Sequence, residues 1–219
     1  MAISTPSASS ETRERILDAA EQLFAEHGFD GTSLRQITVA ADVNLAAVNY
    51  HFGSKEELYS HVFIRRIVPI NARRAALLDE AEVLSANQPL PVAAIFDSFI
   101  RPVFEMADRA PSFLKLLARN IGAPPPFMAE VLESQFRPLI TRYGAALRAA
   151  LPHLSPKTLF WRMHFVVGAT LHCASHHFTI DRMSGGLCHT HDVDEMLRHL
   201  IDFAVAGFSA PPTEAATRA

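Results

Sequence analysis

Apolar residues recur at helical spacing along almost the whole chain, and no alternating run between hairpin signals predicts a strand. The first stripe predicts a helix with one buried face and consists of Ile16, Ala20, Leu23 and Phe24. Gly28 follows at a position suited to a left-handed helix cap, and Phe29 can then fold back onto Phe24. The pattern therefore predicts an all-α protein.

Capping signals place two short helices after the first one. Ser33 and Gln36 have the spacing of a capping box, which predicts a helix over about residues 34–40. Asn44 is a favourable N-cap for a following helix that ends at Gly53. Three short helices joined by tight turns are therefore expected before residue 54.

The rest of the chain predicts longer helices. Ser54 with Glu57 caps a helix toward Leu84, which Pro69 should kink because proline removes a backbone hydrogen bond. Glycine and proline clusters separate the later helical segments, which are residues 92–121 as one or two helices, 127–151, 156–180 and 192–208.

These segments divide the chain into two domains and two tails. A three-helix domain is expected at residues 11–55 and a larger helical domain at 56–208. Residues 1–10 and 209–219 are polar or rich in small residues, so we expect disordered tails there. With 219 residues, 49% of them apolar and 20% charged, the chain can bury a substantial core.

Several classes of protein do not fit this sequence. It shows no signal peptide and no stretch near 18 apolar residues, so we expect a cytoplasmic protein without a membrane span. Cys173 and Cys188 make no disulfide framework and are expected to be free thiols. Without a glycine-rich phosphate loop, a nucleophile motif or a frame of paired carboxylates, neither an enzyme nor a bound cofactor is expected.

Residues 33–52 have the layout of a helix-turn-helix, in which one helix holds a second in the DNA major groove. Small side chains at Ala46 and Ala47 permit close approach to DNA. Hydrogen-bonding groups follow at Asn49, Tyr50 and His51. Any small helical hairpin is the alternative interpretation of this spacing.

The same region resembles the signature of the tetracycline-repressor (TetR) family of transcriptional regulators. The resemblance lies in TSLRQI at residues 32–37 and VNLAAVNYHFGSKEEL at 43–58, together with RILDAA at 15–20. It covers about residues 11–60 without a gap. It implies an all-α regulator, usually a repressor, with an N-terminal helix-turn-helix domain that binds double-stranded operator DNA.

The resemblance also implies roles for individual residues. Thr32, Ser33 and Lys55 would contact phosphates at helix N-termini, and Tyr50 and His51 would anchor the DNA backbone as well. Arg35 would reach a phosphate or a base. Base edges would face Asn44, Leu45, Ala46, Ala47 and Asn49, since alanine methyl groups suit thymine and asparagine pairs with adenine.

The charge of the N-terminal region is unusual for a DNA-binding domain. Residues 11–66 contain six Arg or Lys and nine Asp or Glu, and the whole chain has a net charge of -3. Non-specific attraction to phosphates should therefore be weak. We expect helix N-termini and oriented donors to bind phosphate, with the carboxylates on the far face of the domain.

For the C-terminal domain the resemblance implies an effector site and a homodimer. The helices at residues 156–180 and 192–208 would form a four-helix interface with a second copy. A symmetric dimer would place its two helix-turn-helix domains about 34 Å apart, which matches the half-site spacing of a pseudo-palindromic operator.

An apolar cavity between helices would hold a small apolar effector. Candidate lining residues are Phe96, Phe99, Phe104, Phe113, Leu116, Leu117, Phe136, Phe160, His164 and Phe165. Each of the large apolar side chains can instead be ordinary core. Residues 159–169 are similar to TetR-type regulators that respond to fatty acids or acyl-coenzyme A, which implies such an effector. Arg119 or Arg162 would then pair with its carboxylate or phosphate, or lie at a surface or interface.

Histidines and cysteines gather toward the end of the chain. They are His172, Cys173, His176, His177, Cys188, His189 and His191. Such ligands suit zinc, nickel or copper, but they follow no fixed ligand spacing, so we expect no metal site. A metal-responsive binding protein is the alternative to a repressor released by an apolar effector.

Overall fold

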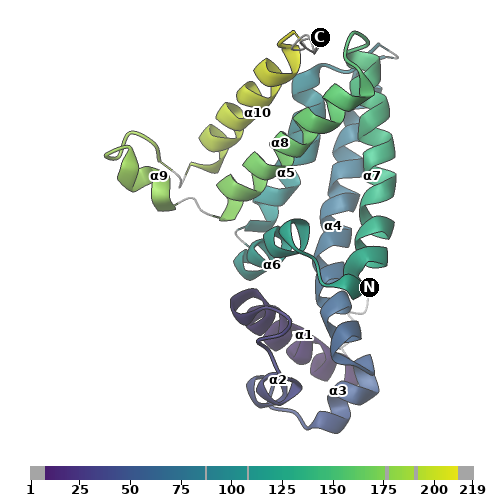
Figure 1. The fold of residues 1–219 in the computed structure, drawn as a ribbon, viewed down its shortest axis with the longest axis vertical. Helices are drawn as coiled ribbons and strands as arrows, with labels where there is room; N and C mark the ends of the chain where they lie inside the picture. The colour runs from purple at the N-terminus through teal and green to yellow at the C-terminus, as the bar shows by residue number, and fades with distance from the viewer. Residues whose placement is uncertain (1–7, 87, 108, 176–177, 190–191, 212–219) are drawn as a thin grey trace, which may run out of the picture. The chain divides into compact units, whose positions relative to one another are not determined.

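The secondary structure consists of helices (Figure 1). The computed structural model describes residues 8–86, 88–107, 109–175, 178–189 and 192–211, and no strand occurs in these ranges. In chain order the elements are α1 (Ala8–His27), α2 (Leu34–Ala40), α3 (Leu45–Phe52), α4 (Lys55–Leu84), α5 (Val92–Ala107), α6 (Pro111–Gly122), the 3-10 turn η1 (Pro126–Met128), α7 (Ala129–Ala150), α8 (Pro156–Ser175), α9 (Phe178–Met183) and α10 (Val193–Ser209). The predicted all-α fold is confirmed.

Side-chain caps fix where the short helices begin. At the start of α2, Ser33 Oγ accepts from the Gln36 backbone N–H, and the Gln36 side chain accepts from the Ser33 backbone N–H. At the start of α3, Asn44 Oδ1 accepts from the Ala47 N–H at 2.8 Å. Gly53 ends α3 with a φ of 75°, a conformation open to glycine because it has no Cβ. The predicted caps are confirmed.

Residues 92–121, expected as one or two helices, form two, α5 and α6, because Pro111 begins the second one. One of the longer segments differs from its prediction. The helix predicted for residues 156–180 ends at Ser175, and α9 begins at Phe178. No glycine or proline lies between these two helices, so the sequence contains no stop signal there.

The described residues form two compact units. The first comprises the described residues up to Pro69 together with Ala110–Gln135, and thus holds α1 to α3, the first part of α4, α6, η1 and the first part of α7. In this unit α1 packs against α2, α3 and α6. Its fully buried side chains include Ile16, Leu17, Phe24, Leu58 and Tyr59. Phe29 stacks on Phe24 as predicted, with 6.2 Å between the ring centroids.

The second unit comprises Ile70–Arg109 and the described residues from Phe136 onward. In it α5 packs against α8 and α10 (Figure 1). The rings of Phe96 and Phe208 meet edge to face with centroids 4.8 Å apart, which joins α5 to α10. Among the described residues, no helix is long and apolar enough to cross a membrane.

Candidate nucleic-acid interface

One face of α3 is held against the first unit. Ile37, Val48 and Phe52 are buried, and α3 packs against both α1 and α2. In the turn between α2 and α3, Asp42 has a φ of 50°, and the Val43 N–H donates to the Thr38 carbonyl at 3.0 Å. This packing fixes the orientation of α3, as a recognition helix requires.

The opposite face of α3 is open to solvent. Its exposed side chains, at the N-cap and along the helix, are Asn44, Leu45, Ala46, Asn49 and Tyr50. Ala47 and His51 are half-buried beside them, and the Tyr50 side chain is 82% exposed. The structure therefore brings together all the residues of this helix that were predicted to contact DNA.

Two further candidates lie at the start of α2. Ser33 and Arg35 are exposed. The Ser33 hydroxyl lies 2.8 Å from the Gln36 side-chain oxygen. A phosphate bound by this hydroxyl would therefore compete with the Gln36 side chain for it. Among the described residues no carboxylate pairs with Arg35, so its guanidinium can reach DNA.

Thr32 does not occupy the position predicted for it. Its side chain is buried, and its hydroxyl meets the carbonyl oxygens of Gly28 at 2.8 Å and Leu23 at 3.1 Å. The hydroxyl thus closes the turn after α1. The prediction of a phosphate contact from this side chain is wrong, because its donor is used inside the fold.

Lys55 begins α4 and lies over an aromatic ring. Its ammonium is 4.2 Å from the centroid of Phe29. The Phe29 ring in turn contacts Tyr59 at 5.5 Å and Phe127 at 4.7 Å. A cation at this distance is attracted to the ring face, which restricts where the ammonium lies. No local sequence signal identifies Phe29 or Phe127 as supports for this lysine.

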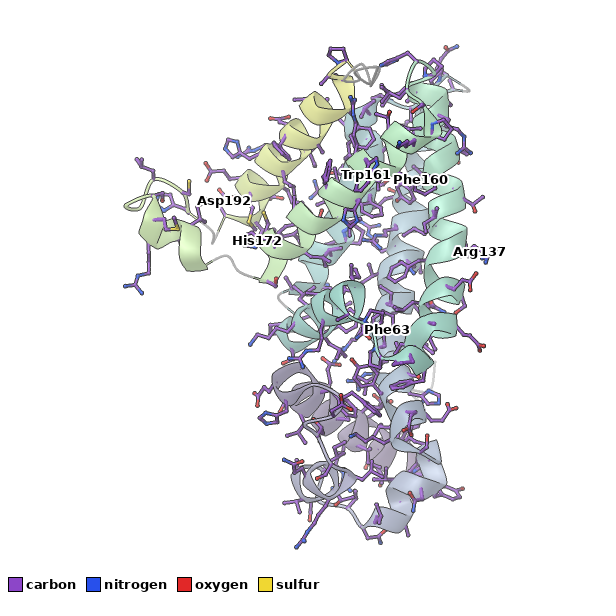
Figure 2. All side chains as sticks on the ribbon, in the orientation of Figure 1. Phe63, Arg137, Phe160, Trp161, His172 and Asp192 are labelled. Atoms are coloured by element: carbon purple, nitrogen blue, oxygen red, sulfur yellow. The ribbon has the colours of Figure 1, made fainter. Side chains whose placement is uncertain are left out.

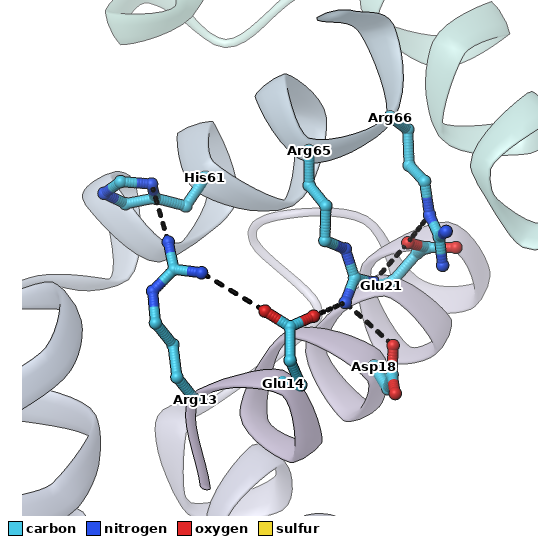
Figure 3. A network of polar contacts seen from close by, with 7 residues as sticks. All are labelled: Arg13, Glu14, Asp18, Glu21, His61, Arg65 and Arg66. Atoms are coloured by element: carbon cyan, nitrogen blue, oxygen red, sulfur yellow. Dashed lines mark hydrogen bonds and ion pairs between the residues drawn. The ribbon is translucent and has the colours of Figure 1, made fainter. Parts of the chain in front are cut away.

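An ion-pair network accounts for part of the acidic charge (Figure 3). Arg65 Nη1 meets Glu14 at 3.1 Å and Asp18 at 2.8 Å, and its Nη2 meets Glu21 at 2.7 Å. Arg66 Nε also meets Glu21, at 2.8 Å. Burial by itself lowers the pKa of Arg65, but hydrogen bonding and charge pairing with Glu21 and Asp18 outweigh it, so the pKa is raised. Two arginines of α4 thus pair with three carboxylates of α1 and offset two of their three negative charges.

The remaining cations are candidates for DNA contact. Among the described residues, Arg15, Arg35 and Lys55 of this region pair with no carboxylate. Arg15 lines an open groove of about 750 Å³ together with Thr38, Asn44 and Ala47. Arg15 was not among the residues predicted to contact DNA, because only the fold brings it from α1 to the groove beside α3. Asp42 lines the same groove, so the expectation that all carboxylates lie on the far face is wrong.

The predicted effector residues are divided between the two units. Phe113, Leu117 and Arg119 belong to the first unit, whereas Phe96, Phe99, Phe136, Phe160, His164 and Phe165 belong to the second. Phe96, Phe99, Phe104, Phe113, Leu116 and Leu117 are buried as core side chains, and Phe136 is half-buried.

Three of these residues are exposed side chains of α8. Phe160, labelled in Figure 2, is 64% exposed, Phe165 is 60% exposed, and His164 is also exposed. Phe160 and His164 line a surface hollow of about 530 Å³ with Lys157 and Trp161. The prediction that they line an enclosed cavity is wrong, because helical spacing does not tell which apolar face is covered.

The two arginines predicted to pair with an effector, Arg162 and Arg119, lie beside backbone groups of the protein. Arg162 Nη1 donates to the Phe208 carbonyl at 2.7 Å and its Nη2 to the Ala210 carbonyl at 2.8 Å, which satisfies the end of α10. Arg119 is exposed, and its guanidinium lies beside Gly28 at the end of α1.

Two family models match the chain. The model described as "Bacterial regulatory proteins, tetR family" matches residues 16–62, and the one described as "Tetracyclin repressor-like, C-terminal domain" matches residues 97–207, about half of the chain. The chain belongs to the TetR family of bacterial transcriptional regulators. The first match includes every residue predicted to contact DNA, and DNA-binding regulation of transcription follows from membership of this family.

Curated TetR-type relatives resemble parts of the chain. The repressor NicS of Pseudomonas putida is 36% identical over 108 residues, which are 49% of this chain and 47% of NicS. The regulator RutR of Escherichia coli is 31% identical over 138 residues, which are 63% of this chain and 61% of RutR. The chain thus spans about half to three fifths of these relatives. Both are regulators of transcription rather than enzymes.

The fold is that of solved TetR regulators. The crystal structure of HlyIIR, a hemolysin II transcriptional regulator, superposes with a TM-score of 0.63 over 90% of this chain and 98% of that chain. With 19% identity, this likeness concerns the fold alone.

The structure offers no support for the metal alternative within its described ranges. No group of three or more histidine, cysteine, aspartate or glutamate side chains able to hold a metal ion occurs among the described residues. Cys188 and His189 are exposed, whereas burial raises the pKa of the Cys173 thiol. His176, His177 and His191 lie outside the described residues.

Proposed function

We propose that this TetR-family regulator is a homodimeric repressor that binds a pseudo-palindromic operator and leaves it when a small apolar effector binds. The observation that carries the DNA-binding part is the contrast between the two faces of α3. One face is buried through Val48 and Phe52, and the other exposes Asn49 and Tyr50. A helix held in this way can place side chains on base edges in the major groove.

The residues divide into those that read bases and those that hold phosphates. Asn44, Leu45, Ala46, Ala47 and Asn49 face base edges in this proposal. Ser33, Arg35, Tyr50, His51 and Lys55 hold the DNA backbone, and Arg15 of α1 joins them in place of Thr32.

Exposed aromatic rings on α8 and α10 support the homodimer. Trp161 and Phe165 of α8 are 56% and 60% exposed and stack with centroids 6.0 Å apart. Phe203 of α10 is 64% exposed, and α10 packs against α8. Large apolar groups in solvent mark an interaction surface, and a second copy presenting the same two helices would cover them.

A fatty acid or acyl-coenzyme A is the proposed class of effector. The similarity of residues 159–169 to acyl-responsive regulators supports it. Such a ligand releases DNA only if it binds more tightly to the conformer that does not fit the operator.

The test is fluorescence anisotropy on DNA from upstream of the protein's own gene, at fixed salt. Tyr50→Ala and Lys55→Ala should each weaken binding to all sequences by about tenfold, because each removes a phosphate contact. Asn49→Ala should change base preference by about 1–3 kcal/mol at one position.

Lys115→Ala is the matched control for loss of one exposed positive charge. Lys115 is exposed on α6 of the same unit and should leave DNA affinity unchanged. Unchanged binding in all three interface variants contradicts the assignment. Addition of dodecanoyl-coenzyme A should weaken wild-type binding, and undiminished binding would rule out an acyl-coenzyme A effector.

A further inference from the structure

A buried arginine interrupts the apolar stripe of α4. Phe63, Ile67, Ile70 and Leu78 follow one another at helical spacing and are buried. Arg74 occupies the position of this stripe between Ile70 and Leu78 and is only 5% exposed. A charged side chain in such a place loses its hydration, so it is costly unless a partner compensates it.

Arg74 has no carboxylate partner among the described residues. In contrast, three less buried arginines of the same unit each pair with two carboxylates. Arg73 pairs with Glu80 and Glu105, Arg101 with Asp97 and Asp194, and Arg142 with Asp79 and Glu82. The most buried guanidinium of this group is thus the uncompensated one.

The hydrogen bonds of Arg74 leave one end of its guanidinium available. Nε donates to the Phe99 carbonyl at 2.9 Å and Nη1 to Asn71 Oδ1 at 3.2 Å, and both acceptors are neutral. Within the described part of the chain, Nη2 has no acceptor. Asn71, which accepts from Nη1, is itself half-buried.

Neighbouring side chains fix the guanidinium in place. The Phe99 ring covers one face, with its centroid 4.3 Å from Arg74 Cζ. The Tyr143 hydroxyl donates to the Arg74 carbonyl at 3.2 Å and lies 3.0 Å from Ser98 Oγ, which joins α7 to α4 and α5 at this level. Burial lowers the pKa of Arg74 to about 10, so the group is still charged at neutral pH.

We propose that Arg74 is the counter-ion for a small carboxylate ligand with an apolar body, bound in the second unit between α4, α5 and α7. The two carboxylate oxygens would accept from Nη1 and Nη2, because the guanidinium fork matches a carboxylate and the Asn71 oxygen can be displaced from Nη1. The apolar body would lie against Phe99 and its apolar neighbours. This inference rests on the proposed function and deepens it, since it names the charge of the effector.

The test measures ligand binding without DNA. The thermal unfolding midpoint of the full chain is recorded with octanoate, benzoate and their uncharged amides octanamide and benzamide, each at about 5 mM and constant ionic strength. At least one carboxylate should raise the midpoint by about 2 °C or more, because a ligand that binds only the folded state stabilises it. Its amide should not. Arg74→Met should abolish the shift, and Arg73→Met, which removes a half-exposed arginine, should keep it.

Several outcomes would overturn the proposal. They are no shift with either carboxylate, an equal shift with the matching amide, or a full shift in Arg74→Met. Should Arg74→Met not fold, Arg74→Lys replaces it: the charge stays but the fork is lost, so the shift should fall by at least half, and an unchanged shift contradicts the role. Anisotropy on operator DNA without ligand tests the DNA-binding function separately, so failure of one is distinguishable from failure of the other.

Discussion

At the scale of single residues, Thr32 and Ser33 are neighbours with opposite roles. The Thr32 hydroxyl is used by two backbone carbonyls inside the fold, whereas Ser33 is exposed at the start of α2. Thr32→Val keeps the shape and removes the hydroxyl, so it should lower the free energy of unfolding by about 1–2 kcal/mol. The salt dependence of DNA affinity should stay as in the wild type, because no phosphate contact is lost. Urea denaturation and anisotropy at several salt concentrations measure the two quantities.

Ser33→Ala is the matched comparison for this prediction. It should cost about 1 kcal/mol through the lost cap and should also weaken DNA binding. A reduced salt slope in Thr32→Val would contradict the internal role of its hydroxyl. The sequence could not separate these two residues, because both are small hydroxyl side chains next to a helix start and only packing decides which one faces solvent.

At the scale of helices, the ion-pair network of α1 and α4 is a test of how the first unit is held together. Glu21 is 4% exposed and accepts from both Arg65 and Arg66. Glu21→Gln removes the carboxylate that pairs with Arg66, whereas Arg65 keeps Glu14 and Asp18, so we expect a loss of about 3 kcal/mol in the free energy of unfolding. Glu26→Gln on the exposed side of α1 is the control and should change it by less than about 0.5 kcal/mol. Equal stability of the two variants would show that the network contributes little.

Helix starts could be predicted where the sequence contains a capping residue close to the start. Capping residues such as Ser33, Asn44 and Asp192 act within one turn, and each caps the helix predicted for it. The stripe of α4 also contained the signal for Arg74, a charge at an apolar position, which was not recognised. What covers a helix face is not local: Phe165 is exposed and Phe96 is buried although both occupy helical stripes. The candidate DNA site was therefore predictable, and the effector site was not.

At the scale of the whole molecule, the proposed homodimer ties the aromatic surface of α8 to operator binding. Phe165→Glu places a charge among exposed rings that a second copy would cover, and two-fold symmetry would bring two such charges into one interface. Loss of a single central aromatic contact costs about 2 kcal/mol or more, which alone raises the dimer dissociation constant about thirtyfold, and the symmetric dimer loses two such contacts.

Sedimentation equilibrium of the variant measures this constant, and Val83→Glu is its control. Val83 is an 80% exposed apolar residue of α4, so the same substitution there changes charge without touching α8 or α10. Operator affinity of Phe165→Glu should fall as its dimer dissociates, because the helix-turn-helix domain of a single protomer contacts only one half-site. Binding to a half-site DNA should stay equal in both variants, since the first unit is unchanged. A Phe165→Glu protein that still sediments as the wild type would place the dimer interface elsewhere.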